Sequence, residues 1–274
     1  MINQKERDKR TFELAREYLL DPKMCDICGR VTLDVLDKYL RPEEPPKRLP
    51  GIYEHMLESA QNANMVSGVI KGGIEKISNL RPVLCKFEPR RISERYTSAE
   101  ELLDEIVEKL KPKGKIRRAS NSIWPKFCRT ALEAAVFLAK FQSAESFYEW
   151  AHEFDCDPRA RAALPLIIAS RVKGLGFALA CDFIKELGFE NYGKPDVQLI
   201  NIFVGLGLSD DKDPYKVFCD IARVAKHAGR KATPYAVDKV FWLIGSGKFY
   251  KDNFQVKRGK EQFIKFARSK LREA

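Results

Sequence analysis

Apolar residues recur at helical spacing through most of this chain. Two stretches illustrate the pattern, one with Phe12, Leu14, Ala15, Tyr18 and Leu19, the other with Leu102, Leu103, Ile106, Val107 and Leu110. No sustained alternation of apolar and polar residues appears, and no two-residue turn joins two strand-like runs. The sequence therefore predicts an all-α fold with short loops.

The composition indicates that the chain can form a hydrophobic core, and its charge indicates a class of binding partner. Of its 274 residues, 45% are hydrophobic, which is enough to bury a core. The 49 Lys and Arg residues outnumber the 38 Asp and Glu residues and give a net charge of +11. An excess of positive charge favours a polyanionic partner.

Several classes of protein are excluded by the same composition. No run of about 18 uncharged apolar residues is present, so we expect no membrane-spanning helix and no membrane partner. The start of the chain lacks the apolar core of a secretory signal. The seven cysteines are scattered, which is typical of a reducing compartment. We therefore expect a cytoplasmic protein.

The segment Val172–Gly176 lies between two helical patterns and contains Gly174 and Gly176 on either side of Leu175. A tight turn between helices needs glycine, because it requires positive φ and close backbone approach. Leu175 is expected to fill the gap between the helices. Free amides would then lie at the start of the second helix, where they suit a phosphate group.

A second segment follows that helix. Pro195 stops any helix before it, and Asp196 is well placed to cap a helix over 197–206. Asp196 follows Ala178 by 18 residues.

Together these segments resemble the helix-hairpin-helix–GPD superfamily of DNA glycosylases. In that family a Leu-Pro-Gly-Val-Gly hairpin precedes a loop that ends in Val-Asp-x-His. Residues 172–176 are similar to the hairpin and residues 194–198 to the loop. Residues 57–63 also resemble the Leu-Ser-Ala-Gln-Ala-Thr segment of endonuclease III relatives, and residues 237–245 a closing helix of alkylbase-type members.

The resemblance implies a two-lobed, all-α helix-hairpin-helix fold and a role in base-excision repair. One helical domain would span 51–188 and end in the hairpin, and a discontinuous second domain would combine 1–50 with 189–274. The implied partner is double-stranded DNA that contains a lesion or mismatch, bound by a monomer. Basic residues Arg223, Lys226, Arg230 and Lys231 would extend the DNA-binding face.

Carried over by position, the resemblance implies a role for each site residue. Asp196 would be catalytic, stabilising the sugar as the N-glycosidic bond breaks. The implied DNA-binding residues are Gln61, Lys173, Gly174, Leu175, Gly176 and Ala178. Bifunctional members have a lysine where this chain has Ala178, so we expect a monofunctional enzyme that uses water as nucleophile. Gln198 replaces the family histidine, and we expect no loss from this change.

Three aromatic residues, Trp124, Phe127 and Tyr192, are candidates to stack on an extruded base, with burial in the core as the alternative. For Gln61 the alternative to a role in DNA binding is a surface position at a helix end.

The Cys25–Cys28 pair lacks the further ligands that structural zinc needs, so we expect no metal. The four-cysteine iron–sulfur loop of endonuclease III relatives is absent. We expect no cofactor, apart from an alkali cation that could bind the hairpin carbonyls.

Three other functions remain open at this stage. The chain could be a helix-hairpin-helix DNA-binding protein in which Asp196 is only a cap. It could be a glycosylase with lyase activity that uses a displaced lysine such as Lys126 or Lys140. It could also be a basic helical protein that binds another protein. The sequence does not identify which base would be excised.

Overall fold

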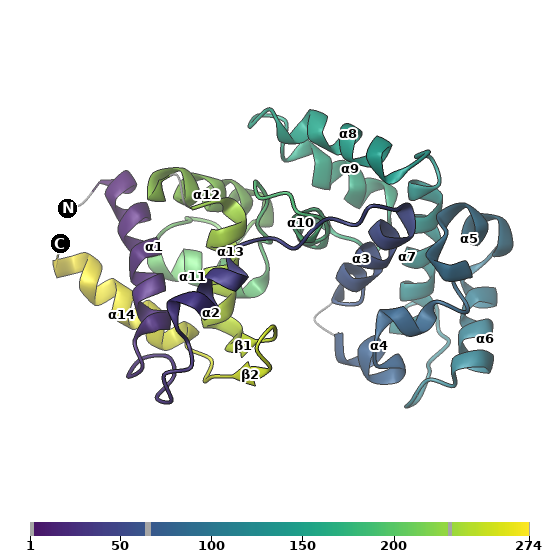
Figure 1. Ribbon diagram of the computed structural model, residues 1–274, viewed down its shortest axis with the longest axis horizontal. Helices are drawn as coiled ribbons and strands as arrows, with labels where there is room; N and C mark the ends of the chain where they lie inside the picture. The colour runs from purple at the N-terminus through teal and green to yellow at the C-terminus, as the bar shows by residue number, and fades with distance from the viewer. Residues whose placement is uncertain (1–2, 64–66, 230–231, 274) are drawn as a thin grey trace. The chain divides into compact units, whose positions relative to one another are not determined.

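The computed structural model describes residues 3–63, 67–229 and 232–273 (Figure 1). These residues are predominantly helical, which confirms the predicted all-α class. One two-stranded antiparallel ribbon is the only sheet among them. None of the described helices is both long enough and apolar enough to cross a membrane.

The chain divides into two compact units. Unit 1 contains Met1–Glu43 and Gly188–Ala274, and unit 2 contains Glu44–Leu187. The sequence prediction placed the corresponding boundaries after residues 50 and 188. The first boundary lies earlier in the structure, because the proline-rich stretch after Glu43 belongs to unit 2. There the Pro46 carbonyl accepts a hydrogen bond from the Tyr148 hydroxyl at 3.0 Å.

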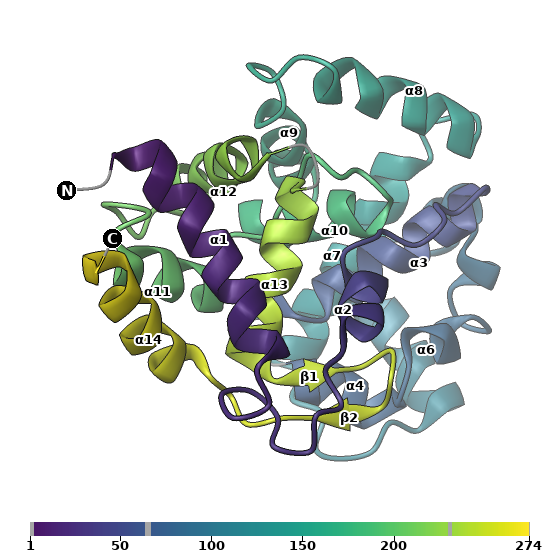
Figure 2. The ribbon, with the colours of Figure 1, turned by 60° about the vertical axis from the view of Figure 1, so that its left-hand side comes forward.

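In unit 1, helix α13 (Pro234–Ser246) contacts the other helices of the unit (Figure 2). Eleven of its residues are buried, from Pro234 to Gly245. The surrounding elements are α1 (Gln4–Leu20), α2 (Leu33–Tyr39), α11 (Val197–Leu206), α12 (Pro214–Ala228), α14 (Lys260–Glu273), β1 (Lys248–Phe249) and β2 (Phe254–Gln255).

In unit 2, helix α7 (Ile123–Leu138) has the corresponding central position and packs against α3, α4, α5, α6 and α9. The other elements of the unit are α3 (Leu49–Ala60), α4 (Ser67–Ile74), η2 (Ile77–Leu80), η3 (Cys85–Phe87), α5 (Pro89–Arg95), α6 (Ala99–Leu110), α8 (Ala144–Asp155), α9 (Ala163–Arg171) and α10 (Phe177–Glu186). Because α7 contacts so many neighbours, it fixes their side chains relative to one another within the unit.

Local signals in the sequence explain where several helices begin. The Ser98 side chain accepts a hydrogen bond from the amide of Glu101 and caps α6. Ser143 and Ser146 form a capping box at the start of α8. Such caps satisfy amide groups that have no partner inside the helix.

In residues 248–274 charged residues alternate with Phe263, Ile264, Phe266 and Leu271, a pattern that predicts one amphipathic basic helix. Only α14 is helical, and β1 pairs with β2 before it. Phe249 stacks on Phe254 with ring centroids 4.8 Å apart, and the Arg30 guanidinium lies 4.6 Å from the Phe254 ring. Asn253 adopts positive φ in the turn. These contacts stabilise the ribbon, and the helical spacing of the sequence does not reveal them.

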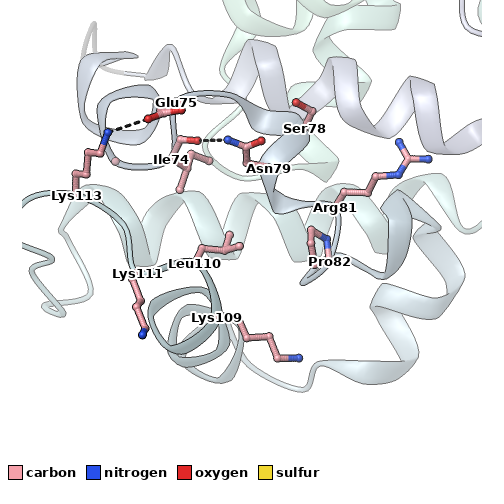
Figure 3. Close-up of a pocket in the computed structure, with 11 residues that line it drawn as sticks. Ile74, Glu75, Ser78, Asn79, Arg81, Pro82, Lys109, Leu110, Lys111 and Lys113 are labelled. Carbon is pink, nitrogen blue, oxygen red and sulfur yellow. Dashed lines mark hydrogen bonds and ion pairs between the residues drawn. The ribbon is translucent and has the colours of Figure 1, made fainter.

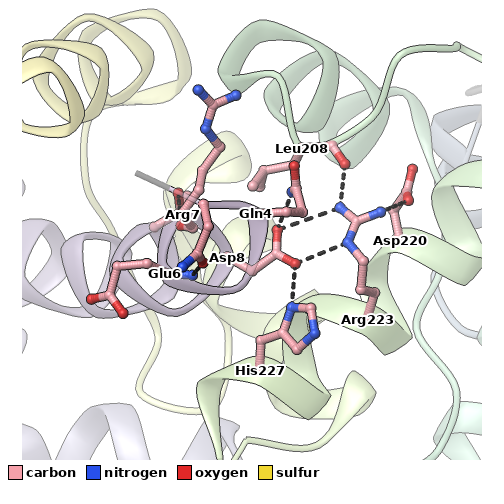
Figure 4. Close-up of polar contacts among 10 residues, drawn as sticks. Gln4, Glu6, Arg7, Asp8, Leu208, Asp220, Arg223 and His227 are labelled. Carbon is pink, nitrogen blue, oxygen red and sulfur yellow. Dashed lines mark hydrogen bonds and ion pairs between the residues drawn. The ribbon is translucent and has the colours of Figure 1, made fainter. Parts of the chain in front are cut away.

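A buried carboxylate joins α1 to α12 in unit 1 (Figure 4). Asp8 is fully buried and accepts hydrogen bonds from Arg223 Nε at 2.9 Å and from Gln4 Nε2 at 2.8 Å. His227 Nδ1 lies 2.7 Å from Asp8 Oδ2, the same oxygen that accepts from Arg223 Nε. Each of these contacts satisfies a charge that would be costly to bury alone.

This cluster corrects one prediction about the basic surface. Arg223 is held by Asp8, by Asp220 and by the Leu208 carbonyl, so its guanidinium is not a free DNA contact. Lys226 is exposed. Arg230 and Lys231 lie outside the described residues.

Removing the buried carboxylate should destabilise unit 1 strongly. We expect Asp8→Ala to lower the free energy of unfolding by about 3 kcal/mol, because it removes the buried carboxylate that pairs with Arg223 and His227. Glu17→Ala on the same helix removes an exposed partner of Arg10, at 2.8 Å, and should cost less than about 1 kcal/mol. Urea unfolding of both variants tests this difference, and equal losses would contradict the role given to Asp8.

Candidate nucleic-acid interface

The turn between α9 and α10 in unit 2 depends on one close backbone approach. Gly174 has φ of +90°, a conformation that side chains disfavour. A Cβ atom at this position would overlap the Thr130 hydroxyl of α7. Glycine is therefore required here for both reasons. Leu175 is fully buried, as predicted, and fills the gap between the two helices.

Polar contacts attach this turn to α7. The Thr130 hydroxyl lies 2.7 Å from the Lys173 carbonyl and 3.0 Å from the Lys126 carbonyl of its own helix. The Lys173 amide donates a hydrogen bond to the Glu133 carboxylate. Two residues one turn apart on α7 thus hold the backbone of Lys173 on both sides.

Two amides of the turn remain available. Those of Gly174 and Gly176 donate no hydrogen bond to any residue that the structure describes. Both glycines are exposed, and Gly176 is the N-cap of α10, with open space where a Cβ would lie. Amides at a helix N-terminus bind an anion well, because the helix dipole adds to the hydrogen bonds.

A pocket of about 400 Å³ lies beside these amides within unit 2. Its walls come from the end of α3, from α4, from the first half of α7 and from the turn. Three cationic residues and no acidic residue line it: Lys126, Arg129 and Lys173. These three side chains are exposed and form no ion pair with a described residue. The pocket is therefore suited to an anionic ligand.

Gln61 follows the last residue of α3 and lines the same pocket. Its Oε1 atom is buried and accepts no hydrogen bond from a described residue. An unsatisfied buried acceptor costs about 1–3 kcal/mol. A ligand with a hydrogen-bond donor would remove that cost. The structure thus brings Gln61 together with Lys173, Gly174 and Gly176, residues predicted from separate segments.

The three aromatic candidates have different environments. Phe127 lines the pocket, although only 5% of its surface is exposed. Trp124 is buried between α4 and α7, where its ring occupies the space that a Cβ on Gly73 would need. Tyr192 is fully buried in unit 1, with its ring against Phe189 and Phe218. Trp124 and Tyr192 therefore have the core positions that were the alternative to base stacking.

Asp196 lies in unit 1 and caps α11, as predicted. Its Oδ1 atom accepts hydrogen bonds from the amides of Gln198 at 2.8 Å and Leu199 at 3.1 Å. Its Oδ2 atom accepts none from a described residue, and the side chain is only partly buried. Capping therefore fixes the orientation of the carboxylate and leaves one oxygen for another partner.

The position of each lysine decides whether it could act as a nucleophile in the pocket. Ala178 lies half-buried in the first turn of α10 and offers no amine. Lys126 is exposed and lines the pocket, whereas Lys140 follows the other end of α7. No sequence pattern indicated Arg129 or Thr130, because only the packing of α7 against the turn brings these two residues to the pocket.

No group of three or more His, Cys, Asp or Glu side chains able to hold a metal occurs in the part of the chain that the structure describes. Burial raises the pKa of the Cys25 thiol to about 12. A thiolate ligand there would therefore be costly to form.

Two backbone carbonyls of the turn already accept one hydrogen bond each. The Lys173 carbonyl accepts from the Thr130 hydroxyl, and the Val172 carbonyl accepts from the Leu175 amide. Each has a second lone pair with which an alkali cation could interact.

Comparison of the chain with protein-family models, with curated proteins and with solved structures finds no match.

The two glycines of the turn should respond differently to substitution. Gly174→Ala places a methyl group against Thr130 at positive φ, so we expect a loss of about 1–3 kcal/mol in the free energy of unfolding. Gly176→Ala meets open space at φ of −64°, and should cost less than about 1 kcal/mol. Chemical unfolding measures both. Equal stability of the two variants would contradict the close approach at Gly174.

Proposed function

We propose that this protein is a monofunctional DNA glycosylase of base-excision repair, which hydrolyses the N-glycosidic bond of a damaged or mismatched nucleotide in duplex DNA. The observation that carries the proposal is the convergence of Gln61 with the glycine turn on one cationic pocket. These residues come from segments that separately resemble parts of the same enzyme family. The two free amides and the three lysine and arginine side chains supply donors for backbone phosphates.

The chemistry assigned to Asp196 follows from what the bond requires. As the bond breaks, its electron pair leaves with the base and positive charge develops on the anomeric carbon. A carboxylate nearby stabilises that charge, and it can accept the proton of the water that attacks the carbon. The products are a free base and an abasic site. The Oδ2 atom of Asp196 is the oxygen available for this role.

Asparagine at position 196 separates catalysis from capping. Asn caps helices about as well as Asp, so Asp196→Asn should keep the stability of the protein. We expect base release from lesion-containing duplexes to fall by at least about 100-fold, with duplex affinity unchanged. Single-turnover assays with alkali treatment, on a panel of duplexes that each carry one lesion, measure the release.

Asp213 offers a matched control. Its Oδ1 atom caps α12 by accepting hydrogen bonds from the amides of Tyr215 at 2.8 Å and Lys216 at 3.1 Å, the same pattern as Asp196. Asp213→Asn should leave base release unchanged. If Asp196→Asn is as active as this control, Asp196 is only a cap. If the wild type releases no base from any duplex in the panel, the glycosylase proposal is wrong.

The position of Lys126 favours one second candidate, a glycosylase with lyase activity. In such an enzyme the lysine amine attacks the anomeric carbon and the base leaves with the electron pair of the N-glycosidic bond. The sugar ring then opens at its C1′–O4′ bond, which gives a Schiff base and a free hydroxyl on the sugar. Such a lysine must be able to reach the sugar of a bound nucleotide, and Lys126 is exposed on the wall of the pocket.

Borohydride trapping distinguishes the two candidates. With water as nucleophile, we expect no covalent adduct between the protein and lesion DNA. An adduct with the wild type that disappears in Lys126→Gln but persists in Lys140→Gln would instead establish Lys126 as the nucleophile. An adduct that forms in both variants would exclude both lysines as the nucleophile, and it would also contradict the proposal that the enzyme is monofunctional.

A further inference from the structure

A second and larger pocket lies in unit 2, away from the glycine turn (Figure 3). Its volume is about 620 Å³, within the range of pockets that hold small ligands. Its walls are the end of α4, the segment from η2 to Pro82, and the end of α6 with the residues that follow. We call it the α4–α6 pocket.

The residues that line this pocket carry an excess of positive charge. Four cationic residues contribute to it, Arg81, Lys109, Lys111 and Lys113, against one acidic residue, Glu75. Lys113 Nζ lies 2.8 Å from the Glu75 carboxylate and offsets its charge. Lys109 Nζ lies 2.6 Å from Glu105. The excess of positive charge therefore comes from the other two cations.

Arg81 and Lys111 are both exposed and form no ion pair or side-chain hydrogen bond with a described residue. Figure 3 shows Arg81 on one side of the pocket and Lys111 on the other. Burial is the main cause that raises the pKa of the Glu54 carboxyl on α3, and the positive charge of Arg81 opposes this shift. Unpaired cations on opposite sides of a hollow favour a ligand with more than one anionic group.

The pocket shares a wall with the pocket at the glycine turn. Ile70 of α4 lines that pocket, whereas Gly73 and Ile74 of the same helix line the α4–α6 pocket. Ile70 and Gly73 are about one helical turn apart, roughly 5 Å along the axis. The Lys113 amide donates to the Gly73 carbonyl at 2.9 Å, which attaches the basic segment 111–118 to this wall. Both hollows and the basic segment thus belong to unit 2.

We propose that the α4–α6 pocket binds backbone phosphates of the same duplex DNA that the glycine turn holds. Arg81 and Lys111 are the residues assigned to those phosphates. The inference depends on the proposed DNA partner and not on base excision. Contacts to phosphate carry no sequence information, so the pocket would add affinity and orientation without choosing the lesion.

The test neutralises the two unpaired cations. The double variant Arg81→Gln/Lys111→Gln should bind a long undamaged duplex on the order of tenfold more weakly at low salt. Each phosphate contact contributes about 0.9 to the slope of log K against log salt, so the magnitude of the slope should fall by about 2. Fluorescence anisotropy over a series of salt concentrations measures both quantities.

A matched variant controls for the change in net charge. Arg90→Gln/Arg91→Gln removes two exposed cations of α5, and neither lines a pocket described above. We expect its affinity and salt slope to stay close to those of the wild type. If both double variants lose affinity equally, or neither loses any, the inference is wrong. Thermal unfolding of each variant shows whether the fold is retained.

A free nucleotide offers the same phosphate chemistry, and titration with a nucleoside monophosphate separates the two sources. If Arg81→Gln/Lys111→Gln abolishes nucleotide binding and leaves duplex binding unchanged, the pocket is a site for a free nucleotide and the inference is overturned. Because the duplex is undamaged, these outcomes do not depend on excision. Loss of base release in Asp196→Asn tests the glycosylase proposal separately.

Discussion

The approach of α7 to the glycine turn is the constraint on which the candidate interface depends. Thr130 occupies the space that a side chain at residue 174 would need, and its hydroxyl holds the Lys173 carbonyl. Glu133 holds the Lys173 amide from the same helix. Because the backbone of the turn is fixed in this way, the amides of Gly174 and Gly176 remain free and the first half of α7 becomes a wall of the pocket.

Ion pairing, more than net charge, determines where this chain can meet a polyanion. Arg223 and Lys113 are held by carboxylates of the protein itself. Other cations have no such partner among the described residues, and several of these line the two pockets of unit 2: Lys126, Arg129, Lys173, Arg81 and Lys111. The net charge of +11 over the whole chain therefore does not locate a binding surface, because carboxylates of the protein pair with some of the cations.

Local features of the structure could be predicted because they depend on nearby residues. The caps of α6 and α11, the burial of Leu175 and the helical class all follow from short-range patterns. Predictions that depended on contacts between distant segments were less successful. Trp124 and Tyr192 have core positions, since aromatic residues at helical spacing fill cores as readily as they line pockets. The β1–β2 ribbon was also missed, because it is stabilised by Arg30 from the other end of the chain.

The sequence by itself determined that the chain is helical, that residues 172–176 form a tight turn and that Asp196 caps a helix. Each of these depends on backbone preferences that act over a few residues. Only the tertiary structure decided that Gln61 lies beside that turn, that Arg223 pairs with the buried Asp8 and that Arg81 and Lys111 line one pocket. Side chains far apart in the chain meet only when the helices pack, and packing depends on the shape of every neighbour at once.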